Sequence, residues 1–344
     1  MLTPSRSEDV FPCLPADLDR VQQRLTPHVE RRPDLTEALR HLFGGVPKLV
    51  RPMLALMSAY LVGDPHRPVD ERVVAAAAAV ELLHVGTMCH DDVMDEADTR
   101  RGRPSVNARW GNVQAILGGD HLLAAASELA AGLGAAEAGI VAGTLRALVD
   151  GQMMETADLF DGYRTEESYY AAITGKTAAL LACACRLGAL EAGGDEPAVE
   201  ALAQFGLELG IAFQINDDVL DLVQTEQHLG KPAGKDLVEG VYTLPVILAA
   251  RRAPGLYPRL AGPMSAGEAE QLRADVVAAG GCEAASKAAA QHLEQAVRAL
   301  EGAVKPGPER DGTIAFGGGL LNAVGIADAG VGASLFYGHS AGVV

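Results

Sequence analysis

Strand-like patterning is scarce in this chain. Aromatic residues make up only 4% of its 344 residues, and apolar and polar residues rarely alternate with a period of two. Apolar residues instead recur at helical spacing over residues 73–89, 113–133, 177–190 and 198–222. Because no alternation of strand and helix patterns appears either, we predict an all-α fold, a single-domain bundle of many antiparallel helices.

Positive charge is also in short supply. Lys and Arg number 28 against 45 Asp and Glu, which gives a net charge of −17. This charge argues against nucleic-acid binding and against electrostatic adhesion to anionic membranes. The most apolar stretch, residues 73–89, contains Glu81 and His84, so we interpret it as a core helix and expect at most transient membrane contact.

Cysteines and targeting signals are few. The five cysteines fit neither a metal-ligand spacing nor a disulfide framework. The N-terminus has no basic region followed by an apolar stretch, so we expect no signal peptide. A reducing cytoplasm is the predicted location.

Composition suggests three segments. Residues 1–15 are predicted to be a flexible arm, and residues 16–305 one continuous helical domain. After Arg310 there is no Lys or Arg while glycine recurs, a composition that favours neither a helix nor a core. We expect residues 306–344 to form a flexible tail.

Two acidic clusters of the same form carry most of the functional information. They are Asp91-Asp92-Val93-Met94-Asp95 and Asp217-Asp218-Val219-Leu220-Asp221. Carboxylates at i and i+4 lie on one helix face, and their repulsion favours bound cations. A few hard oxygen ligands on helices suit Mg²⁺ shared with a phosphate. One such cluster alone is more often a solvated acidic face, but its duplication within apolar sequence argues against that interpretation.

Basic residues near the clusters form a second pattern. Each alone is explained by solvent exposure or, for His84, by a place in the core. Together they predict two pockets that bind anions, in which Arg supplies bidentate phosphate contacts and Lys supplies a point charge. One pocket is bridged to the aspartates by Mg²⁺. The full set of these basic residues is Lys48, Arg51, His84, Arg100, Arg101, Lys176 and Lys231.

The order of the motifs resembles that of the trans-prenyl diphosphate synthases. Glu81-Leu82-Leu83-His84, His90–Asp95 and Arg100-Arg101-Gly102 are similar to the family's first aspartate-rich region. Phe213–Asp221 resembles the second region, and Gly230-Lys231-Pro232 the lysine that follows it. Gly118–Ala124 and Lys176-Thr177-Ala178 are similar to the motifs between them, so the resemblance spans roughly residues 40–300.

This resemblance implies an isoprenoid-synthase fold with a deep central cavity and a homodimer. It implies that three Mg²⁺ ions are held against an allylic diphosphate by Asp91, Asp92, Asp95, Asp217, Asp218 and Asp221. Arg100 and Lys231 contact the same diphosphate, whereas isopentenyl diphosphate is held by Lys48, Arg51, His84 and Arg101. The reacting carbons lie beside Lys176, Thr177 and Gln214.

The chain departs from the family at two residue positions, and the family's usual C-terminal helix pattern is not visible beyond about residue 303. Val241 stands where a lysine often precedes Thr-Leu-Pro, and Lys235 is the nearby candidate to replace it. Leu49 stands where a second basic residue is common.

Product length is predicted from the residues before Asp91. By the resemblance, bulky residues at Gly86 and Thr87 would stop chain growth early, and here both are small. We therefore expect a product longer than C15, and favour a long polyprenyl chain for quinones over a C20 product. The alternative is that the small residues only permit tight helix packing, and that Leu122 or Leu123 instead stops the growth of the chain.

Two other functions remain open. A class I terpene cyclase shares the metal-triggered ionisation but usually has one full aspartate motif and one diphosphate pocket. A non-catalytic partner subunit is expected to have eroded aspartates, whereas all six are present here.

Overall fold

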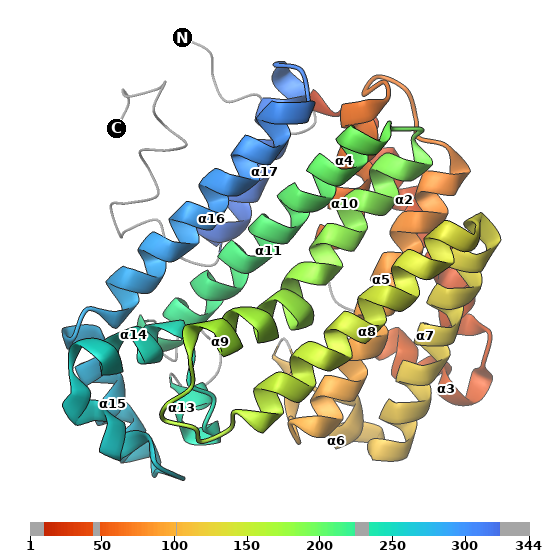
Figure 1. The fold of residues 1–344 in the computed structure, drawn as a ribbon. Coiled ribbons are helices and arrows are strands. Elements are labelled where there is room, and N and C mark those ends of the chain that lie inside the picture. Colours follow the sequence, from red (N-terminus) through yellow and green to blue (C-terminus); the bar gives the residue numbers. More distant parts are fainter. Residues whose placement is uncertain (1–9, 44–48, 101, 224–233, 324–344) are drawn as a thin grey trace, which may run out of the picture. The chain divides into compact units, whose positions relative to one another are not determined.

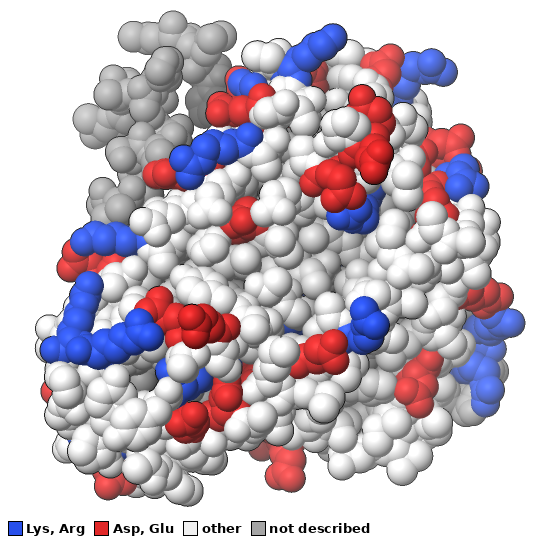
Figure 2. Space-filling view, viewed as in Figure 1, with Lys and Arg blue, Asp and Glu red and all other residues white. Residues whose placement is uncertain are grey.

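The structure, a computed structural model, describes residues 10–43, 49–100, 102–223 and 234–323. Most of these residues are helical (Figure 1), which confirms the all-α prediction. The only strands in the described part are β1 (Thr99–Arg100) and β2 (Arg103–Pro104), which pair antiparallel. On the face shown in Figure 2, acidic and basic side chains are interspersed rather than gathered into one basic field.

Contacts divide the chain into two compact units. The first unit comprises residues 1–146, 180–206 and 300–312, and the second comprises residues 147–179, 207–299 and 313–344. The predicted domain limits at residues 15 and 305 stay a prediction.

The first unit contains helices from the N-terminal half of the chain. These are α2 (Leu14–Glu30), α3 (Pro33–Phe43), α4 (Val50–Val62), α5 (Glu71–Met94), α6 (Val106–Trp110) and α7 (Asn112–Leu133), with the start of α8 (Ala135–Ala157). Most of α10 (Ala179–Glu191) and the first part of α11 (Glu196–Val223) also belong to it.

The second unit is built from the remaining helices. They are the end of α8, α9 (Glu166–Ile173), the π-helical turn η1 (Thr174–Ala178), the end of α11, α13 (Lys235–Glu239) and α14 (Leu244–Arg252). The 3₁₀ helix η2 (Pro254–Leu260), α15 (Ala266–Ala278), most of α16 (Gly281–Ala303) and most of α17 (Pro308–Ala323) complete it. Its buried core includes Tyr169, Ile215, Leu244 and Leu272.

Helix α5 is the centre of the first unit and packs along α7. The carboxylate of Asp70 accepts a hydrogen bond from the Arg72 backbone amide and caps the start of α5. Residues 73–83 are then buried on all sides, because the sequence there is almost entirely alanine, valine and leucine. The two helices approach closely at Gly86, where a Cβ atom would lie only 3.0 Å from the Leu123 side chain.

Among the described residues, three helices are long and apolar enough to cross a membrane by length and composition alone. They are Glu71–Met94, Glu166–Glu191 and Glu196–Val223, with 83%, 56% and 61% of their most apolar windows buried within the protein. The high burial of α5 agrees with the interpretation of residues 73–89 as a core helix.

Both expected terminal segments contain packed or helical residues next to the helical domain. Phe11 is fully buried and stacks on Tyr60 with ring centroids 5.6 Å apart, so the end of the expected arm is packed. Residues 308–323 form α17, although Gly317, Gly318 and Gly319 disfavour a helix. Acidic residues in its first turn and a hydrogen bond from Asn216 Nδ2 to the Leu321 carbonyl (3.0 Å) stabilise its two ends. Residues 1–9 and 324–344 lie outside the described residues.

Candidate active site

One face of α5 stays accessible near the first aspartate cluster. His84, Thr87 and Asp91 are half-buried and Asp95 is exposed, while Val85, Met88 and Asp92 between them are buried. Spacings of three and four residues place the accessible side chains on a single face. His84 and Asp91 therefore share a helix face, as the sequence predicts.

Asp92 faces the interior and is paired with Arg100. Its side chain is 1% exposed, and Arg100 Nε donates to Oδ1 at 2.7 Å while Nη2 contacts the same oxygen. The β1–β2 hairpin delivers Arg100, and Gly102 turns it with φ of 72°, a conformation that glycine adopts freely. The resemblance assigns Arg100 to a diphosphate, whereas the structure shows it bound to an aspartate of the first cluster.

Asp95 and Arg51 are the remaining described members of the predicted set in the first unit. Asp95 caps the C-terminus of α5, and its backbone amide donates to the Asp91 carbonyl at 2.8 Å. Arg51 is half-buried in the first turn of α4. Leu49, the residue that precedes α4 and whose type departs from the family, adopts the left-handed conformation with φ of 41°.

Cys89, which precedes the first cluster, is a buried thiol. Burial, with smaller contributions from Asp92 and Asp91, raises the pKa of its thiol to about 12. The thiol therefore stays protonated near neutral pH.

The second cluster lies on α11 and is more deeply buried than the first. Asp217 is exposed, but Asp218 and Asp221 are 4% and 3% exposed. Asp218 Oδ2 accepts a hydrogen bond from the Tyr169 hydroxyl at 2.5 Å, and Oδ1 accepts one from Gln214 Nε2 at 2.9 Å. Neutral donors, rather than an arginine, thus hold this carboxylate.

Burial raises the pKa of Asp218 to about 7. The hydrogen bonds from Tyr169 and Gln214 oppose this rise, whereas the nearby charges of Asp217 and Glu155 add to it. Burial and the charge of Asp218 in turn hold the pKa of Tyr169 well above its usual value, so its hydroxyl remains a donor. An uncompensated negative charge at Asp218 is therefore costly, and a cation would stabilise it.

The three residues predicted to lie beside the reacting carbons come together in the second unit. Thr177 Oγ1 donates to Gln214 Oε1 at 2.7 Å, which joins Thr177 to the hydrogen bonds of Asp218. Lys176 forms an ion pair with Glu155 of α8. Lys176 and Thr177 lie on the π-helical turn η1, a distortion that occurs often at functional sites.

Glycines make this arrangement sterically feasible. A Cβ atom on Gly175 would lie 2.5 Å from the Ala147 carbonyl, and one on Gly210 would lie 2.5 Å from Ala178 Cα. Larger residues would therefore push α8 and α11 away from η1 and separate Glu155 and Gln214 from their partners.

The structure does not describe the side chains of four predicted site residues. Lys48, Arg101 and Lys231 lie outside the described residues, and Lys235 begins α13 without a described side chain. Because the two aspartate clusters belong to different units, their meeting around one substrate stays a prediction.

The carboxylates suit a metal that is shared with a substrate. Within the described residues, no three His, Cys, Asp or Glu side chains form a ready-made metal cage. Mg²⁺ is usually bound by one or two carboxylates together with phosphates and water. The accessible Asp91, Asp95 and Asp217 fit that mode of binding.

Three residues of the site were not predicted from the sequence. Tyr169 supports Asp218, Glu155 pairs with Lys176, and the buried Arg164 lies next to Tyr169. Tyr169 lies seven residues before Lys176, but the π turn interrupts the helical periodicity that would have placed it. Glu155 and Arg164 are charged, and the sequence alone predicts such residues to lie on an exposed loop or helix face.

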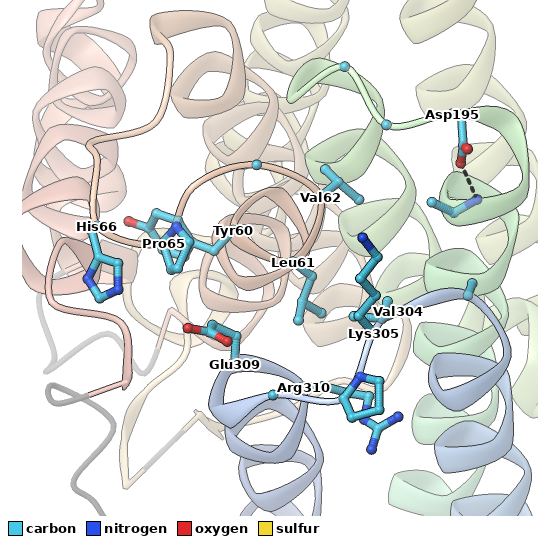
Figure 3. Close-up of a pocket in the computed structure, with 17 residues that line it drawn as sticks. Tyr60, Leu61, Val62, Pro65, His66, Asp195, Val304, Lys305, Glu309 and Arg310 are labelled. Carbon is cyan, nitrogen blue, oxygen red and sulfur yellow. Dashed lines mark hydrogen bonds between the residues drawn. The ribbon is translucent and has the colours of Figure 1, made fainter.

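A separate pocket in the first unit involves none of the predicted site residues. It has a volume of about 740 Å³ and lies at the end of α4, beside the Gly193–Asp195 turn and the start of α17. Figure 3 shows Lys305, Arg310, Asp195 and Glu309 among its lining residues. These charges of both signs indicate no preference for an anionic or a cationic ligand.

Comparisons with known proteins agree with the order of the motifs. A sequence profile described as polyprenyl synthetase matches residues 32–270. The chain is 40% identical over 239 residues to nonaprenyl diphosphate synthase of Mycobacterium tuberculosis, covering 69% of this chain and 70% of that protein. It is 40% identical over 242 residues to heptaprenyl diphosphate synthase component 2 of Geobacillus stearothermophilus, covering 70% and 74%.

A solved structure extends the similarity to the fold. Geranylgeranyl pyrophosphate synthase of Corynebacterium glutamicum, complexed with calcium and isoprenyl diphosphate, superposes with a TM-score of 0.79 at 34% identity. The superposition covers 92% of this chain and 98% of that one.

Proposed function

The chain belongs to the polyprenyl synthetase family and is a prenyltransferase, and from that premise we propose that it elongates an allylic diphosphate with isopentenyl diphosphate in a Mg²⁺-dependent reaction. The observation that carries this proposal is the Thr177–Gln214–Asp218 chain of hydrogen bonds, which joins a predicted metal ligand to residues predicted beside the reacting carbons. The calcium and isoprenyl diphosphate named for the Corynebacterium relative support a divalent metal and this substrate class.

Mg²⁺, when bound, supplies charge that stabilises the departing diphosphate. The allylic C–O bond breaks and its electron pair leaves with the diphosphate, so an allylic cation remains. The isopentenyl double bond then forms the new C–C bond, and the departing diphosphate takes the proton whose loss restores an alkene. Asp91, Asp95 and Asp217 are accessible enough to hold the metal, with Asp92, Asp218 and Asp221 behind them.

The uncharged dipoles of the site suit a cationic intermediate. Gln214 is held by hydrogen bonds at both ends of its amide, so its dipole is fixed before the reaction begins. The Thr177 hydroxyl donates its hydrogen to Gln214, so the lone pairs of Thr177 Oγ1 are left to face positive charge. Arg51 and His84, in the first unit, are proposed to hold isopentenyl diphosphate.

We propose that the product is longer than C15 and favour a long polyprenyl chain, with a C20 product as the alternative. The nonaprenyl and heptaprenyl relatives support the first, and the geranylgeranyl relative the second. Thr87 is better placed than Gly86 to limit the product. It lies on the accessible face of α5, whereas Gly86 faces Gly119 and Leu123 of α7.

A single substitution tests the role of Thr87. Thr87→Phe should shorten the main product by at least one isoprene unit, because the ring occupies the space next to Asp91. Thr87→Val, which changes the volume little, is the matched control and should leave the product unchanged. Chain lengths are read by chromatography of the dephosphorylated products. An unchanged product from a folded, active Thr87→Phe enzyme would remove this face from the path of the growing chain.

A homodimer is proposed because α7 presents an uncovered apolar face. Val113, Ile116 and Leu117 are 69%, 43% and 50% exposed and follow helical spacing. The Geobacillus relative, by its name, is one component of an enzyme, so a second type of subunit remains an alternative partner. Sedimentation of the purified chain distinguishes a monomer from a dimer.

The experiment that tests the function uses the purified chain alone. Labelled isopentenyl diphosphate is supplied with geranyl, farnesyl or geranylgeranyl diphosphate and Mg²⁺. Incorporation of the label into a longer prenyl diphosphate supports elongation. Conversion of the allylic substrate into an unlabelled hydrocarbon would indicate a terpene cyclase, and no product at all would indicate a non-catalytic subunit.

A further inference from the structure

Arg164 is a buried cation just before α9 in the second unit. The residue is 6% exposed and its side chain 2% exposed. Buried arginines are rare unless their charge is compensated. Asp158 supplies that compensation, with Arg164 Nε 3.0 Å from Asp158 Oδ2.

The rest of the guanidinium connects two further elements. Nη1 donates to the Tyr242 carbonyl at 3.1 Å, and Cζ lies 5.6 Å from the centroid of the Tyr169 ring. Nη2 is buried and makes no hydrogen bond to any described residue. One planar group therefore fixes the segment before α9, the backbone before α14 and one face of Tyr169.

Neighbouring contacts hold these segments in place independently. The Phe160 backbone amide donates to the Gly240 carbonyl at 2.8 Å, and Gly240, with φ of 78°, leaves room for the Phe160 ring. Ser168 hydrogen-bonds to the same oxygen of Asp158 that pairs with Arg164. Loss of Arg164 would therefore alter the packing of Tyr169 without releasing the whole segment.

Tyr169 carries the effect of Arg164 to the second aspartate cluster. Its ring is 1% exposed, and its hydroxyl is one of the two donors that hold Asp218. We propose that Arg164 is a positioning residue that acts through Tyr169 to fix the Asp218 carboxylate for the metal-bound diphosphate. This inference rests on the proposed function, because it assigns Asp218 to metal–diphosphate binding.

The geometry explains why an arginine stands at this position. The planar fork of the guanidinium bonds Asp158 and the Tyr242 carbonyl at the same time and lies over the face of the Tyr169 ring. A lysine carries the same charge but lacks this fork. Outer residues that orient metal ligands typically change metal affinity by about 10–100-fold when they are mutated.

The test is a double-mutant cycle measured by binding, not only by turnover. Isothermal titration calorimetry gives the dissociation constant of inorganic pyrophosphate in the presence of Mg²⁺ for wild type, Arg164→Met, Tyr169→Phe and the double variant. Each single variant should weaken binding by about tenfold. The double variant should be no weaker than the worse single variant, because both changes interrupt one connection.

Arg251→Met is the matched control. Arg251 also contacts α9, through an ion pair with Glu166, but its side chain is 51% exposed. Its removal should leave pyrophosphate binding within about twofold of wild type, which is the scale expected for a surface ion pair. Arg164→Lys should bind like Arg164→Met, and it replaces that variant in the cycle if Arg164→Met does not fold.

Three outcomes would overturn the inference. Unchanged binding in folded Arg164 variants would exclude a positioning role. Additive losses, about 100-fold in the double variant, would show that Arg164 does not act through Tyr169. Wild type that binds no pyrophosphate with Mg²⁺ would overturn both this inference and the proposed function, whereas wild type that binds it but makes no prenyl product would overturn the proposed function alone.

Discussion

The two aspartate clusters share a sequence pattern but differ in how their buried carboxylates are compensated. In the first unit, Arg100 pairs with the buried Asp92. In the second, Tyr169 and Gln214 hold Asp218 through neutral hydrogen bonds, and burial raises the pKa of that carboxyl to about 7. The motif therefore fixes the position of the carboxylates on the helix, whereas neighbouring residues decide how much a bound cation is needed.

The largest expected effect comes from removing one carboxylate from each cluster. Asp91→Ala and Asp218→Ala should each lower kcat by about 100-fold or more, because both clusters are proposed to stabilise the departing diphosphate. Steady-state kinetics on folded variants, with circular dichroism to verify the fold, measures the loss. A near-normal rate in either variant would show that only one cluster serves the reaction.

The second largest expected effect is a loss of stability when Arg100, the arginine that pairs with the first cluster, is removed. Arg100→Leu removes the ion pair that Arg100 makes with the buried carboxylate of Asp92, which should lower the free energy of unfolding by roughly 2–3 kcal/mol. A larger loss is not expected, because the arginine is 38% exposed and solvent screens the pair. Asp92→Asn combined with Arg100→Leu should recover part of the loss in urea unfolding. No recovery would mean that the arginine stabilises the hairpin rather than the aspartate.

The second cluster should show a smaller effect that depends on pH. The pKa of Asp218 is raised in the folded protein, so between about pH 4 and 7 the folded state binds more protons than the unfolded state. The contribution of this group to stability is therefore present at low pH and is lost as pH rises through about 7. Without metal, Asp218→Asn should be more stable than wild type at pH 8 by roughly 1–2 kcal/mol, and this advantage should vanish near pH 4.

Urea unfolding of the metal-free proteins at both pH values measures this difference. Glu268→Gln, at an exposed capping position in the same unit, provides a control for general effects of charge removal. An advantage of Asp218→Asn that is independent of pH would contradict the raised pKa.

Much of the first cluster follows from the sequence because its geometry is local. His84 and Asp91 share one face of α5 as helical spacing requires, and the hairpin that carries Arg100 lies only a few residues further on. The buried state of Asp92 and its pairing with Arg100 depend on the packing around α5, which spacing alone does not reveal.

The second cluster depends on contacts that are distant in sequence. Tyr169 approaches Asp218 only because η1 is π-helical and Gly210 lets α11 pack against it. Helix α17 was missed for a related reason. Its glycine-rich composition disfavours a helix, and its stability comes from burial of Thr313 and Leu321 and from the hydrogen bond of Asn216.

The requirement for Mg²⁺ tests the central claim most directly. The transfer of labelled isopentenyl diphosphate to an allylic diphosphate is measured after EDTA treatment and again as Mg²⁺ is restored. If both clusters act through bound metal, product formation should stop with EDTA and return with Mg²⁺ in wild type, but should recover poorly in Asp91→Ala and Asp218→Ala. Continued transfer in the presence of EDTA would contradict a metal-dependent reaction at these clusters.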